Sequence, residues 1–243
     1  MAEQAEPSKY DPRSNHLLAR LKREDYDALM LVAKPVALKF HKRLLYQDQK
    51  VDAVYFPLSC MFSLLVTVDK EPQMEMATIG REGVVGASEV LQELGAIGLN
   101  LIQIAGWAMR IDADAFRRVV SCHPLIRQIV QRDQYSLMRQ ILYGAACNRL
   151  HTMEERCARS LLMTHDRACQ DTFPLTQEFL SHMLGVRRAT VNVATGALKK
   201  AGVIRYVRGK ITILDRPGLE SATCDCYQSV VKLYESQFAA AVQ

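Results

Sequence analysis

The chain has 243 residues, 49% of them hydrophobic, which is enough for packed cores and excludes an intrinsically disordered protein. The formal net charge is +5, but residues 1–120 carry 15 basic and 16 acidic groups whereas residues 121–243 carry 16 and 10. We therefore expect two domains, of which only the second has the charge to bind a polyanion. No run approaches 18 apolar residues, so a transmembrane helix is excluded, and seven scattered cysteines without an apolar leader predict a reduced cytoplasmic protein.

The first half of the chain predicts a small antiparallel β-roll or sandwich. Residues 1–15 are polar and contain two prolines, so we expect a mobile tail there, followed by a short helix near residues 20–30. Short β-rich runs separated by turn residues follow at 44–46, 53–57, 61–68 and 74–79. A glycine-rich loop at 80–86 leads to a helix at 87–94, strands at 99–105 and 107–111, and a helix at 112–120.

Residues 125–150 carry the longest helical pattern in the chain. Their apolar residues recur along one side with a spacing close to that of a helical seam. A long helix between two domains usually needs a partner, so we predict that it dimerises; the alternative is that its apolar side packs only on the chain's own domains. The predicted dimer interface comprises Leu125, Ile129, Leu137, Ile141 and Ala145. A further amphipathic helix is expected at residues 153–164.

Residues 176–201 predict two short helices joined by a glycine turn. Thr176 is placed to cap the first helix, and Gly185 ends it at a position where a positive φ comes easily only to glycine. A hairpin follows, with strands at 203–207 and 210–214 around the two-residue turn Arg208-Gly209. Helix, turn, helix and hairpin in this order are typical of a winged helix.

The charge of this region favours DNA over a simple helical hairpin in a bundle core. Between residues 174 and 214, seven basic side chains stand against a single glutamate. In helix-turn-helix proteins the N-terminal end of the second helix enters the major groove, where Arg can bind a guanine edge and Asn an adenine edge. The predicted DNA-binding residues are Arg187, Arg188, Thr190, Asn192, Thr176, Gln177, Lys199, Lys200 and Arg208.

The remaining chemistry-bearing residues give weaker signals. Cys224-Asp-Cys226 has one-residue spacing without further clustered Cys or His, so we expect structural thiols and predict neither a metal nor a cofactor. The histidines lack metal-ligand spacing, and the sequence contains no nucleophile elbow or phosphate loop, so we do not expect an enzyme.

With a sandwich, a long central helix and a winged helix in this order, the chain resembles the Crp/Fnr family of bacterial transcription regulators. The most specific match is Leu184-Gly-Val-Arg-Arg-Ala-Thr-Val191, which is similar to the family's recognition-helix entry G-x-S-R-E-T-V, and Tyr55-Phe-Pro57 and the loop at 80–86 add the pattern of the sandwich. The resemblance implies an α+β fold: a cyclic-nucleotide-binding-like β-roll at residues 16–120, a dimerisation helix at 121–150, a winged helix-turn-helix DNA-binding domain at 151–218 and a C-terminal helical tail at 219–243.

The resemblance also implies partners and roles. It implies a homodimer on a two-fold-related promoter or operator in double-stranded DNA, with RNA polymerase as a further candidate partner and no membrane. Arg188 matches the family arginine that contacts guanine, and Thr190 matches a residue that contacts phosphate or packs at the groove. Ala189 and Val193 stand where members such as the cyclic-AMP receptor protein have a glutamate and an arginine, so a different half-site is expected.

Gly83, Gly86 and Glu89 are the candidate effector-binding residues, because they resemble the loop that holds the nucleotide in members that bind one. Between Arg81 and Arg110, however, the sequence has no basic residue to neutralise a cyclic phosphate, which favours a simple turn. The alternative function is a protein-interaction or signalling module with a degenerate DNA-binding domain.

Overall fold

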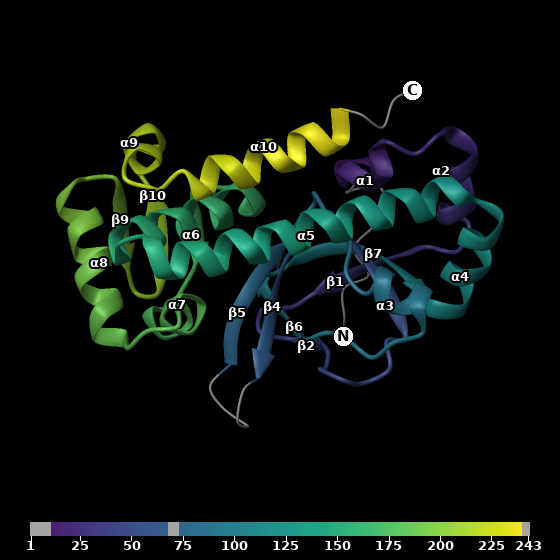
Figure 1. Cartoon of the computed structure of the whole chain (residues 1–243), viewed down its shortest axis with the longest axis horizontal. Helices are drawn as coiled ribbons and strands as arrows, with labels where there is room; N and C mark the ends of the chain where they lie inside the picture. The colour runs from purple at the N-terminus through teal and green to yellow at the C-terminus, as the bar shows by residue number, and fades with distance from the viewer. Residues whose placement is uncertain (1–10, 68–72, 240–243) are drawn as a thin grey trace, which may run out of the picture. The chain divides into compact units, whose positions relative to one another are not determined.

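The computed structural model describes residues 11–67 and 73–239. They form two compact units, one of residues 11–62 and 79–134, and the other of residues 63–67, 73–78 and 135–239 (Figure 1). Most of the tail expected at residues 1–15 therefore lies outside the described residues. Within the described ranges, no helix is both long enough and apolar enough to cross a membrane.

The first unit contains most of the predicted β-roll. Its elements are η2 (Pro12–Ser14), α1 (His16–Ala19), α2 (Arg23–Met30), β1 (Lys34–Leu38), β2 (Arg43–Leu45), β3 (Ala53–Pro57), α3 (Ala87–Gln92), β6 (Leu99–Ile104), β7 (Gly106–Asp112) and α4 (Ala113–Cys122). The hairpin of β4 (Met61–Thr67) and β5 (Gln73–Ile79) starts and ends in this unit, while its middle belongs to the second. The predicted long helix is confirmed as α5 (Pro124–Leu150), which begins in the first unit and ends in the second.

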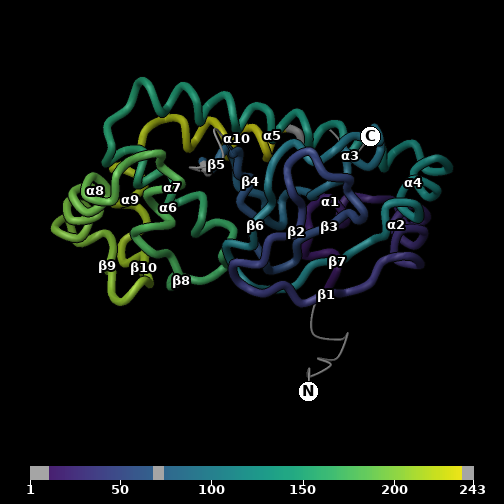
Figure 2. The backbone as a smooth tube through the Cα atoms, turned by 90° about the horizontal axis from the view of Figure 1, so that it is seen from below, coloured from purple at the N-terminus to yellow at the C-terminus, as the bar shows by residue number. Residues whose placement is uncertain are grey.

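Two antiparallel sheets build the roll. One contains β1, β7 and β3, which Figure 2 labels, in the order β1-β7-β3. In this sheet Val36 lies opposite Ala108 and Tyr55 lies opposite Arg110. The other has the order β2-β6-β4-β5, and the register shifts where β2 pairs with β6. Ile102 of β6 and Ile111 of β7 are fully buried between apolar neighbours. These sheets confirm the predicted α+β class with an antiparallel roll.

Three details of this unit differ from the sequence prediction. Asn15, expected in the mobile tail, is fully buried, and its side-chain amide donates to the carbonyl oxygens of Pro57 and Gly83, each at 3.0 Å. The helix expected near residues 20–30 is confirmed as α2, but the short helix α1 before it was not expected. The sequence does not predict β1 because Pro35 interrupts its pattern, yet β1 lies at the edge of its sheet, where proline is tolerated.

The second unit contains the predicted winged helix. Its further elements are α6 (Met153–Ala168), β8 (Thr172–Pro174), α7 (Gln177–Leu184), α8 (Arg188–Lys200), β9 (Ile204–Val207), β10 (Lys210–Ile213), α9 (Arg216–Ser221) and α10 (Cys226–Ala239). α6 packs against α7 and α8, and Leu161, Leu162 and Val191 are fully buried. β8, too short to predict at three residues, extends the wing to the order β8-β10-β9.

Arg216, at the start of α9, holds several elements of the second unit together. Its guanidinium donates to Asp166 Oδ1 at 2.7 Å, to Glu220 Oε1 at 2.8 Å and to the Tyr227 hydroxyl at 2.6 Å. It also lies 2.8 Å from Nδ1 of His165. One side chain therefore links α6, α9 and α10.

We predict that Arg216→Met lowers the free energy of unfolding by about 2 kcal/mol, because it leaves several polar partners without their donor while keeping the apolar stem. Partial exposure of the Arg216 side chain, at 36%, keeps the expected cost below that of a buried ion pair. Urea denaturation followed by circular dichroism measures the change, with exposed Arg205→Met as the control. Equal midpoints for the two variants would contradict the assignment.

Candidate nucleic-acid interface

The turn between α7 and α8 is fixed by caps at both ends of α7. The Thr176 hydroxyl accepts a hydrogen bond from the Phe179 amide at 3.1 Å, which satisfies a free donor of the first turn. Gly185 ends the helix with φ 63°, and the next amide, that of Val186, donates back to the Ser181 carbonyl at 3.1 Å. The predicted threonine cap and glycine turn are both confirmed.

α8 has one buried face and one exposed face. Val191, Ala194 and Leu198 are buried against the unit's core, and the Thr195 hydroxyl is satisfied by the Val191 carbonyl at 2.8 Å. Its first turn carries no acidic residue, so the positive end of the helix dipole is not neutralised locally. Such an end is suited to a phosphate or another anion.

The turn of the wing places the basic residue Arg208 near the N-terminus of α7. Arg208 and Gly209 both have positive φ, at 48° and 73°, as a two-residue hairpin turn of type I′ requires. The Leu175 amide donates to the Gly209 carbonyl at 2.9 Å, so the tip of the wing lies beside the N-terminus of α7. The structure thus brings Arg208 close to Thr176.

The predicted DNA-binding residues fall into separate groups. Most are exposed and Gln177 is half-buried; the exposed ones are Arg187, Arg188, Thr190, Asn192, Thr176, Lys199, Lys200 and Arg208. The first four cluster at the N-terminal end of α8. The two lysines end the same helix, about 17 Å along its axis from Arg188 at 1.5 Å per residue, so they cannot share a contact point with it.

Two exposed apolar residues also belong to this face. Val193 is 68% exposed, and Ala189 is exposed in the first turn of α8. Small apolar side chains on a recognition helix can contact the methyl group of thymine. The sequence shows only that Ala189 and Val193 differ from the family pattern. That both side chains face solvent follows from the burial of the opposite face of α8, which the structure shows.

The candidate effector residues have structural roles in the first unit. Gly86 precedes α3 with φ 82°, and a Cβ there would lie 2.9 Å from the Ala53 carbonyl oxygen. A Cβ on Gly83 would lie 3.0 Å from Oδ1 of Asp133. Glu89 is buried, and burial raises the pKa of its carboxyl above the ordinary value. Packing inside the roll therefore favours glycine at positions 83 and 86.

Asp133 on α5 makes the surroundings of this loop acidic. It is 6% exposed, and its Oδ2 accepts from the Val84 amide at 3.4 Å. Burial, followed by the charges of Glu82 and Glu89, raises the pKa of Asp133 well above its usual range. An anionic phosphate placed against Gly83 would thus lie beside Asp133, which offers it no compensating positive charge.

A second group of side chains could hold a metal. Cys147, His151, Cys224 and Cys226 present ligand atoms that all lie within 4.8 Å of one another. The expectation that Cys224 and Cys226 lack clustered partners is therefore wrong. More than 70 positions separate the two pairs in the sequence, so only the fold brings them together.

Part of the chain matches a known family model, and its fold is similar to solved structures. Residues 155–222 match the family model of the Crp-like helix-turn-helix domain. FixK2 from Bradyrhizobium japonicum is 15% identical, with a TM-score of 0.67 over 79% of this chain and 98% of its own. A putative transcriptional regulator of the Crp/Fnr family from Eubacterium rectale is 14% identical, with a TM-score of 0.67 over 86% of this chain and 98% of its own.

The c-di-GMP responsive global regulator CLP from Xanthomonas campestris is 9% identical, with a TM-score of 0.65 over 79% of this chain and 99% of its own. At such identities the likeness establishes the fold alone. A search of curated protein sequences gives no match.

We predict that Asp133→Asn changes how stability depends on pH. The pKa of Asp133 is raised in the folded state, so the folded protein binds this proton more tightly than the unfolded chain does. The resulting contribution to folding stability is fully present at low pH. It is lost as the pH rises above the pKa of the unfolded chain, about 3.9. The variant should therefore gain stability relative to wild type as the pH rises from about 4. Urea midpoints across this range test it.

The matched control is Asp52→Asn, an exposed carboxyl of the same unit. Parallel pH profiles for wild type and Asp133→Asn would contradict the raised pKa.

Proposed function

We propose that the chain is a transcription regulator of the Crp/Fnr type that binds double-stranded DNA sequence-specifically as a homodimer; its fold and the Crp-like helix-turn-helix domain at residues 155–222 support this. The observation that carries this proposal is the N-terminal end of α8. It presents exposed Arg187, Arg188 and Asn192 beside an uncompensated helix dipole, while the opposite face of the helix is buried.

We propose that the exposed side chains of α8 and the wing contact different parts of the DNA. Arg188, at the first position of α8, is placed to bind a guanine edge with its two-pronged guanidinium, and Asn192 one turn later is suited to adenine. Thr176 and Arg208, which lie in the segments joined by the hydrogen bond from Leu175 to Gly209, are suited to backbone phosphates, as are the lysines at the far end of α8. Arg187 is the N-cap residue, so it can take either role.

The dimer would form along α5 in the second unit. Tyr135, Met138 and Leu142 are 46%, 51% and 58% exposed, and with exposed Ala145 they recur at intervals of three and four residues. This spacing places them on one face of the helix, as in a helical seam. An exposed apolar row of this kind is suited to the same row on a second copy.

This row refines the interface expected from the sequence. Ile129 is only 8% exposed, and Leu125, Leu137 and Ile141 are half-buried within the chain. Ala145 belongs to both sets. We propose that the seam lies one position further along the helix than Leu137 and Ile141, at Met138 and Leu142.

In the first unit, we propose that the loop around Gly83 is a turn that preserves the roll and is not a phosphate cradle. The buried carboxyl groups of Glu82, Glu89 and Asp133 support this, since a cyclic nucleotide carries a negative charge.

We predict that Arg188→Ala weakens binding to the preferred operator by about 1–3 kcal/mol, because the lost base contact is worth that much discrimination. Binding to random DNA should change far less. Fluorescence anisotropy with operator and random duplexes at several salt concentrations measures both effects. Equal losses on all sequences would make Arg188 a phosphate contact.

The control is Arg23→Ala on α2, since Arg23 has a 92% exposed side chain in the first unit. It removes the same charge without touching α8. If wild-type affinity for random DNA did not fall steeply with salt, the chain would instead be an interaction module with a degenerate DNA-binding domain.

We predict that Leu142→Glu raises the dimer dissociation constant more than tenfold, because two-fold symmetry buries the new charge twice in an apolar seam. Sedimentation velocity over a range of concentrations measures it. Leu31→Glu is the control, since Leu31 is 87% exposed on the first unit. A wild-type-like dimer for Leu142→Glu would exclude this row as the seam.

A further inference from the structure

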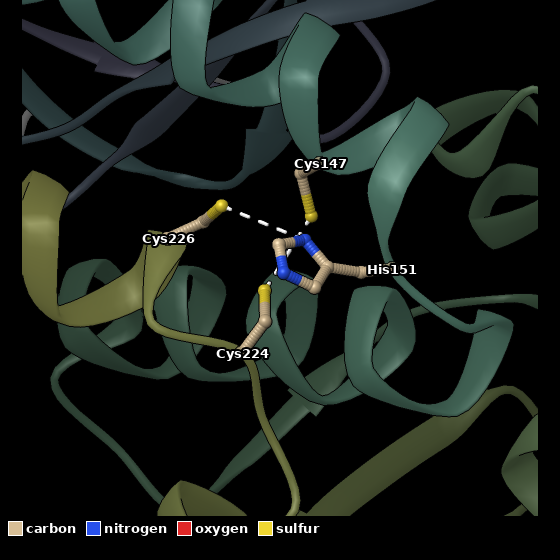
Figure 3. Close-up of side chains that lie close together, drawn as sticks. All are labelled: Cys147, His151, Cys224 and Cys226. Atoms are coloured by element: carbon tan, nitrogen blue, oxygen red, sulfur yellow. Dashed lines mark hydrogen bonds between the residues drawn. The ribbon is translucent and has the colours of Figure 1, made fainter.

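Four potential metal ligands meet where α5 ends and α10 begins (Figure 3). The His151 amide donates to the Cys147 carbonyl at 3.2 Å, which continues the helical turn and puts both side chains on one face. Cys224 and Cys226 flank exposed Asp225, and the Tyr227 amide donates to the Cys224 carbonyl at 3.1 Å. This turn points both thiols toward Cys147 and His151.

The distances fit a single tetrahedral ion. The Cys147 and Cys224 sulfur atoms are 3.5 Å apart, and the Cys226 sulfur lies 3.7 Å from Nδ1 of His151. Zn–S bonds of about 2.3 Å and Zn–N bonds of about 2.0–2.1 Å in a tetrahedron separate the ligand atoms by roughly 3.5–3.8 Å. These two separations match a bound ion, and the four ligand atoms all lie within 4.8 Å of one another, so small side-chain movements would complete the site.

We propose that Cys147, His151, Cys224 and Cys226 bind one Zn²⁺ ion as a structural site. Three thiolates and an imidazole are a soft donor set that zinc prefers, and four protein ligands leave no open position for substrate. The three cysteines are at most 8% exposed, so they form a protected site and not a surface cluster. Binding releases the three thiol protons to solvent.

Arginine side chains of α6 act electrostatically on the cluster, because the positive charge of Arg159 interacts with Cys147. Arg156 and Arg159 of α6 each have a buried Nε that lacks a hydrogen-bond partner among the described residues. Three thiolates around Zn²⁺ leave a net charge of −1, which these guanidinium groups can balance.

The alternatives fit the cluster less well. A disulfide needs about 2.05 Å between sulfur atoms, well below the 3.5 Å between Cys147 and Cys224. A [4Fe–4S] cluster takes its ligands on four different irons, so it needs a wider set than one confined within 4.8 Å. Both remain outcomes of the test.

The site would join the two ends of the DNA-binding domain. Cys147 and His151 precede residues 155–222, which match the Crp-like helix-turn-helix domain, and Cys224 and Cys226 follow them. The ligands thus lie outside the matched segment and belong to this chain's own flanks. An ion there would close the chain around the domain, and it would stabilise the fold because the unfolded chain lacks the assembled site.

The test measures metal in the full-length protein purified under reducing conditions without added metal. Elemental analysis should find one zinc per chain in wild type and less than a tenth of that in Cys224→Ser/Cys226→Ser. The control Cys122→Ser/Cys169→Ser removes two exposed thiols outside the cluster and should keep its zinc. A chelator should lower the melting temperature of wild type and this control, but not that of the zinc-free variant.

A titration with Co²⁺ tests the site in the wild-type protein, so its result does not depend on whether the double variant folds. Chelated wild type titrated with Co²⁺ should develop thiolate charge-transfer and tetrahedral d–d absorption, and His151→Cys should keep one ion while shifting those bands. Folded wild type that binds neither ion would overturn the proposal. Bound iron with cluster absorption, or an anaerobically purified chain lighter by two hydrogens through a Cys147–Cys224 disulfide, would overturn it as well.

Discussion

The packing of α8 against the core of its unit is the constraint on which the proposed DNA site depends. Val191 and Leu198 are 0% and 3% exposed, so rotating the helix about its axis would bring apolar surface into water at a cost of about 25 cal/mol per Å². That cost fixes the direction in which Arg188 and Asn192 project. The left-handed conformation of Gly185 then fixes where α8 starts relative to α7. Both side chains are therefore exposed, as the proposed DNA-binding surface requires.

The two units use charge in opposite ways. In the second unit the basic side chains of α8 and the wing are exposed to solvent. They are therefore accessible to the phosphates of the proposed DNA partner. In the first unit Glu82, Glu89 and Asp133 are buried carboxyl groups, and burial favours the protonated forms of Glu89 and Asp133. The modest net charge of +5 therefore conceals a basic surface in one unit and an acidic interior in the other. Whether protonated or ionised, these carboxyl groups offer no positive charge to a small anion placed beside them.

Local signals in the sequence were sufficient for α7, α8 and the hairpin of β9 and β10. A threonine cap, a glycine turn and Arg208-Gly209 act within a few residues, so their geometry follows from backbone energetics alone. β1 was out of reach because its strand character depends on β7, more than 60 residues away. The exposed row of α5 depends on which side of the helix its own chain covers, so the sequence suggested Leu137 where the structure exposes Met138. The cluster of Cys147, His151, Cys224 and Cys226 could not be predicted either, because it depends on the fold. Neither Cys147 with His151 nor Cys224 with Cys226 indicates a metal site by itself.

α5 can serve the proposed dimer and the proposed zinc site at once because they use different sides of it. At 3.6 residues per turn each residue advances by about 100°, so Met138 and Leu142 differ by only about 40° while Leu142 and Cys147 differ by about 140°. The exposed apolar row and the ligand pair therefore point in nearly opposite directions. One side of the helix is free for a second copy, and the other is fastened to the start of α10. An ion that clamps Cys147 to α10 would stiffen the last turns of the same helix that carries Leu142, so metal occupancy and dimer stability are expected to be coupled through the backbone of α5.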